Sequence, residues 1–410
     1  MHSAYKIFCP KALKKEKTKL AKKEQNEFEI ARKKRQKKFA AQRTRKFIGG
    51  MLVLAILVTG IYFFIEEDVA GIIGDRIASS ASAGEGFPVD VSGTNVLKTF
   101  SVGEHFGVLT DISYALYAEN GKQLLAAQHD FANPVVETSG RRFLIYDQGG
   151  NRLVVRMRDK ILFEKQFEYK IISADLSFDG TLTVVTSAQR YASKVHVFDS
   201  DYQEEIFTWS AADEYVVSAS ASEKEKTVAA AALSANESGE IVTTVHIFTT
   251  EAAVELAKKE FKGASVLSLE FDSDGDIKLI CDTLAATFSR DGKILGSCGL
   301  GSVPVACHNI SGTDGAALVF DRFTEERATD ILFLDKTFAE AKNLSVSGRY
   351  VCSDRSENNT AVYCSGTAFV YNNDGEATAV LSSEQDAVMI KLIRESLFAV
   401  TRDQLCKIEK

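Results

Sequence analysis

The sequence lacks the short motifs that mark the common catalytic sites. It contains no H-E-x-x-H, no G-x-S-x-G and no Walker A pattern. Gly299-Leu-Gly301 begins like a dinucleotide-binding G-x-G-x-x-G loop but lacks the third glycine. These absences remove the sequence support for a zinc protease, an α/β-hydrolase, a P-loop enzyme or a Rossmann dehydrogenase. We therefore assign no catalytic, cofactor-binding or metal-ligating residue, and no cofactor, from the sequence.

Paired cysteines are also missing. None of the 7 cysteines has the C-x-x-C spacing of a zinc or redox site, and Cys9 stands alone near the N-terminus. We expect the others to be unpaired thiols buried on strands, because a disulfide framework would be spread over the whole domain. If a bridge forms, Cys352–Cys364, flanking a predicted turn at 354–360, is the first pair to test. The six cysteines are confined to the last third of the chain: Cys281, Cys298, Cys307, Cys352, Cys364 and Cys406.

Charge is divided unequally along the chain. Residues 1–46 carry 17 Lys and Arg against 4 Glu, a balance of +13, whereas the remainder carries −20. Residues 11–46 are predicted to form a charged helix or a disordered arm, with too few apolar residues for a coiled-coil seam. We expect the arm to contact anionic lipid head groups. Nucleic acid could be attracted by the same charge density and is the less favoured partner.

A single uncharged run of 19 residues, Phe47–Ile65, follows the arm. A helix of that length spans roughly the 30 Å hydrocarbon core of a bilayer, so the run predicts a transmembrane helix. Basic residues precede it and Glu66, Glu67 and Asp68 follow it. The positive-inside rule then places residues 1–46 in the cytoplasm and the rest outside the cell membrane.

A cleaved signal peptide is the main alternative to this anchor. Ala81-Ser82-Ala83 has the small residues of a cleavage site. However, the charged segment before the apolar run is very long, and this site lies well beyond the end of the run. We therefore expect an uncleaved signal-anchor, and the Ala-, Ser- and Gly-rich residues 66–86 are predicted to be a flexible spacer.

The hydrophobic period changes from about Phe87 to the C-terminus. Short β-branched runs such as Thr181–Thr186 and Ser396–Thr401 alternate with turns, and no long helical stripe appears. Gly or Asn supplies the positive φ that tight hairpins require. The hairpin signals are Asn120-Gly121, Gly149-Gly150-Asn151, Asp179-Gly180, Asp274-Gly275, Asp291-Gly292 and Asp374-Gly375.

These short units repeat. Val195-His-Val-Phe-Asp199 and Val245-His-Ile-Phe-Thr249 are near-copies, and Ser173–Gly180 matches Ser268–Gly275. Self-similarity at about 40 residues, with about four strands per unit, indicates a β-propeller. Eight units begin near residues 94, 133, 171, 214, 265, 303, 345 and 386.

The last unit has only about three strands, and a strand within 87–92 is expected to complete it and close the ring. The prediction is therefore an all-β, eight-bladed propeller over 87–410, preceded by the basic arm (1–46), the transmembrane helix (47–65) and the spacer (66–86). Seven blades and a pair of β-sandwiches are the alternatives.

The repeat units resemble the WD40-like and quinoprotein-like propellers. The layout of residues 47–410 resembles an uncharacterised bacterial family of single-pass membrane propellers with a domain of unknown function. The resemblance rests on Asn133-Pro-Val-Val136, Ser139-Gly140 and Tyr146-Asp-Gln-Gly-Gly150. It implies the fold and a bacterial origin but carries over no catalytic residue. Quinoprotein propellers dock blades with tryptophans, and a single tryptophan, Trp209, argues against a quinone cofactor.

Three groups of residues could carry chemistry. His196 and His246 occupy equivalent repeat positions, where a shared metal site is imaginable but repeat equivalence is the simpler explanation. Asp272-Ser-Asp-Gly-Asp276 could bind a hard cation, although it lacks the glycine position and distal Glu of an EF-hand loop and is more simply a charged hairpin turn. Acid–base groups are also available, but the sequence does not pair them: His105, His129, Asp111 and Glu137.

The sequence therefore favours a non-enzymatic scaffold of the cell envelope, with a propeller that binds a protein or another ligand outside the membrane. The first alternative is an envelope enzyme that acts on saccharide or peptidoglycan fragments. The second is a single-pass sensor that signals through its cytoplasmic arm.

Overall fold

The computed structural model describes residues 86–408 except 253, 302, 312–314, 322–327, 357–358 and 383–385, together with residues 32–35, 51 and 74. The chain divides into two compact units, Met1–Ala78 and Ser79–Lys410. Residues 32–35 are helical. The predicted arm and transmembrane run lie outside the described residues except at these positions, and Ala81-Ser82-Ala83, the cleavage site of the alternative, lies wholly outside them. No described helix is both long and apolar enough to cross a membrane.

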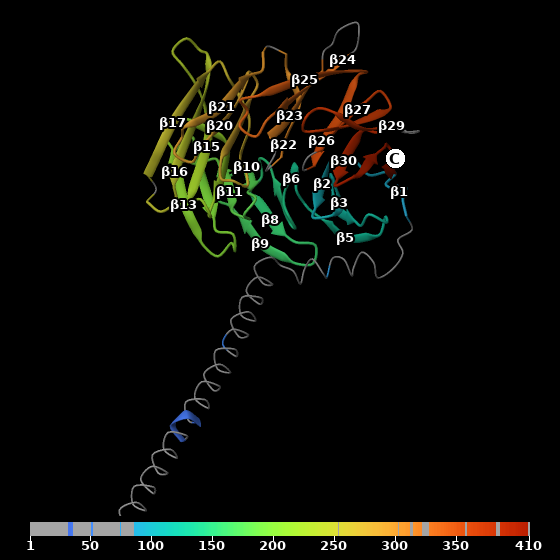
Figure 1. The fold of residues 1–410 in the computed structure, drawn as a ribbon. Helices are drawn as coiled ribbons and strands as arrows, with labels where there is room; N and C mark the ends of the chain where they lie inside the picture. The colour runs from blue at the N-terminus through green and yellow to red at the C-terminus, as the bar shows by residue number, and fades with distance from the viewer. Residues whose placement is uncertain are drawn as a thin grey trace, which may run out of the picture. The chain divides into compact units, whose positions relative to one another are not determined.

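The second unit consists of four-stranded antiparallel sheets, the blades of a propeller (Figure 1). Within a blade each strand pairs with the next one along the chain, except in the last blade, whose fourth strand comes from the beginning of the propeller sequence. Blade 1 contains β2 (Val96–Val102), β3 (His105–Thr110), β4 (Ser113–Tyr117) and β5 (Gln123–Gln128); blade 2 contains β6 (Pro134–Ser139), β7 (Arg142–Asp147), β8 (Arg152–Arg156) and β9 (Ile161–Gln166); blade 3 contains β10 (Ile171–Leu176), β11 (Leu182–Thr186), β12 (Ser193–Phe198) and β13 (Glu205–Ala211); blade 4 contains β14 (Tyr215–Ser222), β15 (Thr227–Ala235), β16 (Ile241–Thr249) and β17 (Val254–Lys262).

The remaining blades follow the same plan. Blade 5 contains β18 (Val266–Phe271), β19 (Ile277–Cys281), β20 (Leu284–Phe288) and β21 (Ile294–Gly299); blade 6 contains β22 (Val305–Ser311), β23 (Gly315–Asp321), β24 (Ala328–Leu334) and β25 (Ala341–Ser347); blade 7 contains β26 (Tyr350–Ser356), β27 (Asn359–Cys364), β28 (Thr367–Asn372) and β29 (Ala377–Ser382); blade 8 contains β30 (Met389–Ile393), β31 (Ser396–Val400), β32 (Gln404–Ile408) and β1 (Val89–Asp90). The predicted eight-bladed propeller is confirmed.

The ring closes through β1, as predicted. This strand pairs with β32, with Val89 opposite Leu405 and Asp90 opposite Gln404. The first blade then lies beside the last one, so β2 contacts β30 (Figure 1). Phe398 of blade 8 stacks on Phe106 of blade 1 with ring centroids 5.1 Å apart. The two ends of the propeller sequence are thereby held in one sheet and one core.

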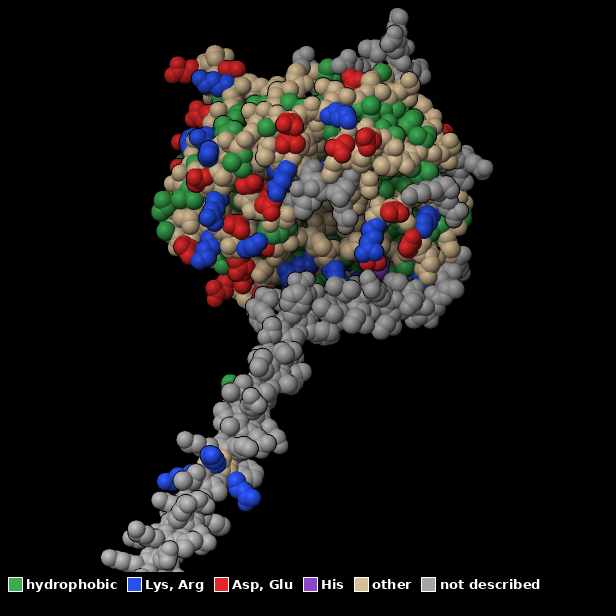
Figure 2. Space-filling model, viewed as in Figure 1, with side chains coloured by type: hydrophobic (Ala, Val, Ile, Leu, Met, Phe, Trp, Pro, Cys, Tyr) green, Lys and Arg blue, Asp and Glu red, His purple; other side chains and the backbone are tan. Residues whose placement is uncertain are grey.

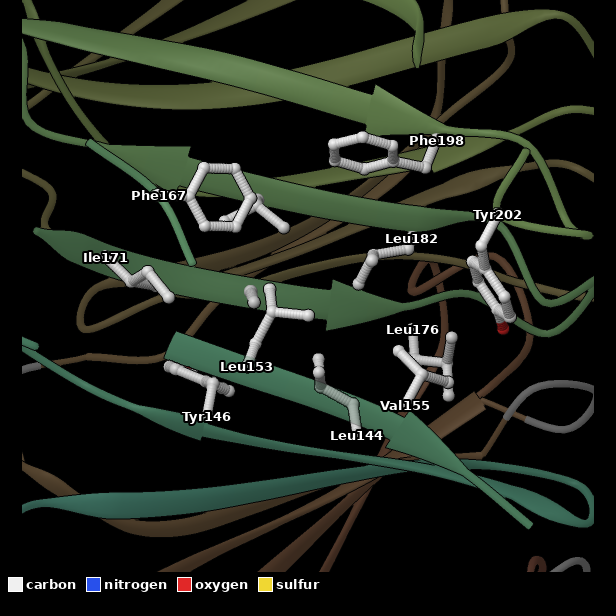
Figure 3. Packing of buried hydrophobic residues seen from close by; sticks show 12 residues of the cluster. Leu144, Tyr146, Leu153, Val155, Phe167, Ile171, Leu176, Leu182, Phe198 and Tyr202 are labelled. Carbon is white, nitrogen blue, oxygen red and sulfur yellow. The ribbon is translucent and has the colours of Figure 1, made fainter. Parts of the chain in front are cut away.

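The core lies between neighbouring blades. The second strand of a blade is buried on both faces, as in β11, and is therefore almost wholly apolar or Thr. The fourth strand alternates exposed and partly buried residues, as in β9. Figure 3 shows the packing of blade 2 against blade 3, where the labelled residues are Leu144, Tyr146, Leu153, Val155, Phe167, Ile171, Leu176, Leu182, Phe198 and Tyr202.

The inner strands share a β-bulge near their beginning. The register shifts between Val96 and Lys98 in β2, and equivalent shifts occur in β10, β14, β18, β22 and β26. A bulge bends its strand and leaves one residue without a partner opposite it. The bulged residues are Leu97, Ile172, Val217, Leu267, Ala306 and Val351.

The acidic loop 272–276 is a hairpin turn between β18 and β19. Asp272 Oδ1 accepts hydrogen bonds from the amides of Asp274 (3.0 Å) and Asp276 (2.9 Å), and Gly275 adopts a φ of +85°. Asp272 also forms a buried ion pair, 3.2 Å from the ammonium of Lys278. Lys278 donates to the Lys336 carbonyl of blade 6. No three His, Cys, Asp or Glu side chains among the described residues are grouped to hold a metal ion.

We therefore predict that Asp272→Ala destabilises the propeller by about 3 kcal/mol, because it leaves the buried Lys278 ammonium without its counter-charge. Asp274→Ala is the control, since this carboxylate pairs with Lys336 at the exposed surface and its loss costs less than about 1 kcal/mol. Urea unfolding followed by circular dichroism measures both free energies. Equal losses of unfolding free energy in the two variants would contradict the role of Asp272 as the counter-charge of Lys278.

Candidate ligand-binding channel

The inner strands of all eight blades line a central cavity of about 890 Å³. A second cavity of about 300 Å³, lined by Thr138, Asp175 and Glu270 among others, adjoins it where the inner strands end. In Figure 2 the visible face of the propeller is hollowed near its centre and carries side chains of both charges. The acidic, basic and histidine side chains that line the larger cavity are Lys98, Glu137, Asp175, Glu270, His308, Asp354, Arg355 and Lys391.

The cationic side chains of the channel already have partners. Lys98 Nζ lies 3.2 Å from the Glu137 carboxylate, and Lys391 Nζ lies 2.9 Å from that of Asp354. Arg355 donates to the Thr360 hydroxyl and to the side chain of Asn373 on the same blade. The channel therefore holds two internal ion pairs, and neither lysine is left uncompensated.

Among the described residues that line the channel, Asp175 and Glu270 are the acids without a paired cation. Asp175 accepts hydrogen bonds from the hydroxyls of Ser220 (2.6 Å) and Ser177 (3.0 Å). Burial raises the pKa of Asp175 to about 6, with a smaller opposing effect from the Ser220 hydrogen bond. Burial also raises the pKa of Glu270 to about 8, reinforced by the charges of Asp175 and Glu137. One wall of the channel thus holds two acids that bind protons more tightly than free carboxyl groups do.

The bulges place these two acids at equivalent positions along their inner strands. Asp175 is the second residue after Ser173, which follows the bulge in β10, and Glu270 is the second residue after Ser268 in β18. Sequence reasoning missed both acids as site residues. Their signal was present in the matching segments Ser173–Gly180 and Ser268–Gly275, where each repeat has an acid at the third position.

The acid–base candidates named from the sequence do not form one site. Glu137 lines the channel, whereas His105 is buried in β3 and Asp111 is exposed. His129 Nε2 lies 3.0 Å from the Thr110 carbonyl oxygen, and its ring stacks on Phe131. The structure therefore uses His129 in packing and brings Glu137 alone of the four to the channel.

His196 and His246 are equivalent, as their repeat positions predict. Each Nδ1 contacts a glutamate on the neighbouring outer strand, Glu205 at 2.6 Å and Glu255 at 2.7 Å. The ring of His246 also packs on Trp209, with centroids 4.8 Å apart. Burial lowers the pKa of His196 despite the opposing effect of Glu205. These contacts are within and between blades, and the described residues form no shared metal site there.

The six described cysteines form no disulfide, as expected, while Cys9 lies outside the described residues. Cys352 of β26 is opposite Tyr363, and Cys364 of β27 is opposite Tyr350. The Cys352–Cys364 bridge is therefore absent. The predicted turn at 354–360 is also wrong, because most of it belongs to β26 and β27, which continue the hairpin almost to its tip.

We predict that Glu270→Gln stabilises the protein by about 2 kcal/mol at pH 8. This free energy is smaller than the full pKa shift would give, because solvent in the channel screens the charge. A raised folded-state pKa means that ionisation favours the unfolded chain. The gain should therefore be absent below about pH 4.5, grow as the pH rises and level off above about pH 8.

The control for this prediction is Glu237→Gln, in the exposed turn between β15 and β16. Denaturant unfolding at several pH values measures both variants. A gain for Glu270→Gln that does not depend on pH would contradict the assignment of Glu270 as a desolvated acid.

Two solved structures are similar to this chain. The C-terminal WD40 domain of Sif2 is 12% identical with a TM-score of 0.55, and the match covers 79% of this chain and 99% of that one. BamB from Moraxella catarrhalis is 10% identical with a TM-score of 0.47, covering 78% of this chain and 99% of that one. No curated protein matches the sequence. The likeness to Sif2 shows the fold alone.

A family model does cover most of the chain. It matches residues 84–409, which includes every strand of the propeller. The match agrees with the resemblance to a domain of unknown function. The chain therefore belongs to the family of unknown function DUF5711.

Proposed function

We propose that this protein is a membrane-tethered scaffold of the bacterial cell envelope, which binds a partner protein through one face of its propeller. A closed ring of sheets is a rigid support for loops and strand ends, and these are where such folds place their binding residues. The proposal rests mainly on the distribution of exposed apolar side chains over the two faces.

The face at which the inner strands begin, here called the bulge face, carries most of these side chains. The bulged residues Leu97, Leu267 and Val351 are 40%, 41% and 42% exposed. The connections from second to third strands and from outer to inner strands also lie on this face, because neighbouring strands are antiparallel. Five more exposed apolar side chains lie in these connections or at the strand ends beside them: Ile112, Tyr191, Tyr215, Ile241 and Val388.

Apolar side chains gathered around a channel mouth, and surrounded by polar residues, are typical of a protein-binding surface. Isolated exposed apolar residues are common on any protein and would not support this conclusion. Here Leu97, Leu267 and Val351 occupy the equivalent bulged position in three blades. This repetition is the observation that carries the proposed function.

The tether supports the same proposal. The chain enters the propeller at the beginning of β1, and as a fourth strand β1 begins on the face opposite the bulge face. The bulge face is therefore free of the attachment point. The uncharged run 47–65, with a +13 segment before it and −20 after it, supports a signal-anchor with the propeller outside the cytoplasm.

We predict that the double substitution Leu97→Glu and Leu267→Glu removes most of the partner captured by in-cell crosslinking. Two charges at the centre of an apolar interface must be desolvated without a partner, which weakens binding by about tenfold or more. Ile161→Glu is the matched control, since Ile161 is 56% exposed on the outer strand β9. Unchanged crosslinking in the double variant would refute the docking face.

We also predict that the full chain stays with membranes after alkaline carbonate washing, whereas a chain lacking residues 1–65 does not. In spheroplasts, protease added outside should degrade the propeller of the anchored chain. An unrelated signal-anchor in place of residues 1–65 should preserve partner capture. Loss of capture after this exchange would favour the sensor, in which the native arm and helix take part.

A further inference from the structure

His246 lies between two carboxylates at the joint of blades 3 and 4. Its Nε2 contacts the Glu214 carboxylate, and its Nδ1 lies 2.7 Å from the carboxylate of Glu255. Glu214 belongs to the connection between β13 of blade 3 and β14 of blade 4, whereas Glu255 is on β17. The imidazole is buried, and Trp209 of β13 packs on it. The histidine therefore links the end of blade 3 and the connection after it to the third and fourth strands of blade 4.

The two carboxylates define the protonation state that this joint requires. A neutral imidazole has one N–H donor and one acceptor nitrogen, whereas an imidazolium donates from both nitrogens. Ionised carboxylates only accept hydrogen bonds, so they satisfy both nitrogens of His246 only when the ring carries its second proton. Loss of that proton leaves a bare nitrogen against a carboxylate in a buried site, which breaks one of the two contacts.

We propose that His246 is a pH-sensitive latch, which holds the connection 212–214 against blade 4 while the imidazole is charged and releases it when the imidazole is neutral. Histidine is the residue type that changes charge near neutral pH. Tyr215 directly follows the latched Glu214 and is exposed on the bulge face, so release loosens the beginning of β14 at that face. The proposal goes beyond the docking function and does not depend on it.

The other charged groups around the ring keep their charge near neutral pH. Burial would raise the pKa of Glu214, but hydrogen bonds from Lys258 and His246 outweigh burial and hold this pKa below its ordinary value. Its hydrogen bond to Glu214 raises the pKa of Lys258. Lys258 Nζ lies 3.0 Å from Glu214 and 4.0 Å from Glu260, while Glu255 completes the charged groups that β17 places here. The side chains that β15 and β13 place against the ring are uncharged.

The contact with Glu214 is the one that a neutral ring loses. Glu214 has a second partner in Lys258, whereas Glu255 depends on the Nδ1 proton. Lys258 is 43% exposed, and an ion pair at the surface stabilises a joint by less than about 1 kcal/mol. This remaining pair is therefore too weak to keep the connection closed when the imidazole is neutral.

His196 shows the alternative arrangement at the equivalent position of blade 3. Its Nδ1 faces Glu205, and its Nε2 lies 3.2 Å from the Thr186 hydroxyl. A hydroxyl can donate as well as accept, so a neutral His196 keeps both contacts. Burial lowers the pKa of His196, which agrees with a neutral ring. His196 is therefore the matched control for the latch.

The test uses the fluorescence of Trp209, the single tryptophan of the chain, in the full-length protein in non-ionic detergent. The ring of Trp209 lies 4.8 Å from that of His246 between centroids. Acrylamide quenching is measured as the pH is raised from about 5.5 to about 8.5, the range in which histidines lose their charge. The quenching constant should rise along this series, because the opened joint exposes the indole to the quencher.

Three variants locate the change. His246→Gln should abolish the pH dependence of quenching, since glutamine does not titrate. Glu214→Gln should move the midpoint of the transition to lower pH by about one unit, because it removes a carboxylate that favours the charged ring. His196→Gln should keep the transition of the unaltered protein.

A quenching constant that stays the same across the pH series, or a transition that survives in His246→Gln, overturns the proposal. If His246→Gln does not fold, an unshifted midpoint in Glu214→Gln overturns it instead. The Leu97→Glu and Leu267→Glu double variant should keep the fluorescence transition while it loses the partner, so failure of the latch is distinguishable from failure of the docking function.

Discussion

The pairing of β1 with β32 is the contact on which the arrangement of the propeller depends. It joins residues from the two ends of the propeller sequence in one sheet, and so converts a row of blades into a ring. Without it, blades 1 and 8 would each expose a face that now lies in the shared core of Phe106 and Phe398.

Closure has a chemical consequence at the centre of the ring. Eight inner strands face one axis, so side chains from distant parts of the sequence share one small volume of water. Lys98 and Lys391 enter that volume with their own carboxylate partners. Asp175 and Glu270 enter without a paired cation, and burial raises the pKa of both acids. The electrostatics of the channel are therefore a property of the ring rather than of any one blade.

The bulges affect both the channel and the exposed surface around its mouth. Each bulge adds one residue near the beginning of an inner strand, and in three blades this residue is a large exposed apolar side chain: Leu97, Leu267 and Val351. The same shift sets the level at which Asp175 and Glu270 lie further along their strands. One local irregularity, repeated in six blades, thus places both the apolar bulge face and the acidic wall.

The sequence by itself determined the fold class, the number of blades and the closing strand. These follow from local signals, namely strand periodicity, Asp-Gly turns and repeats such as Ser173–Gly180 and Ser268–Gly275, because a hairpin is specified by neighbouring residues. It did not determine which acids share the channel. That depends on bulges and on contacts between blades, as for Asp354 with Lys391. Only the tertiary structure decided these pairings. The sequence pattern around an acid in an alternating strand is the same whether the partner of that acid is water, a lysine or another acid.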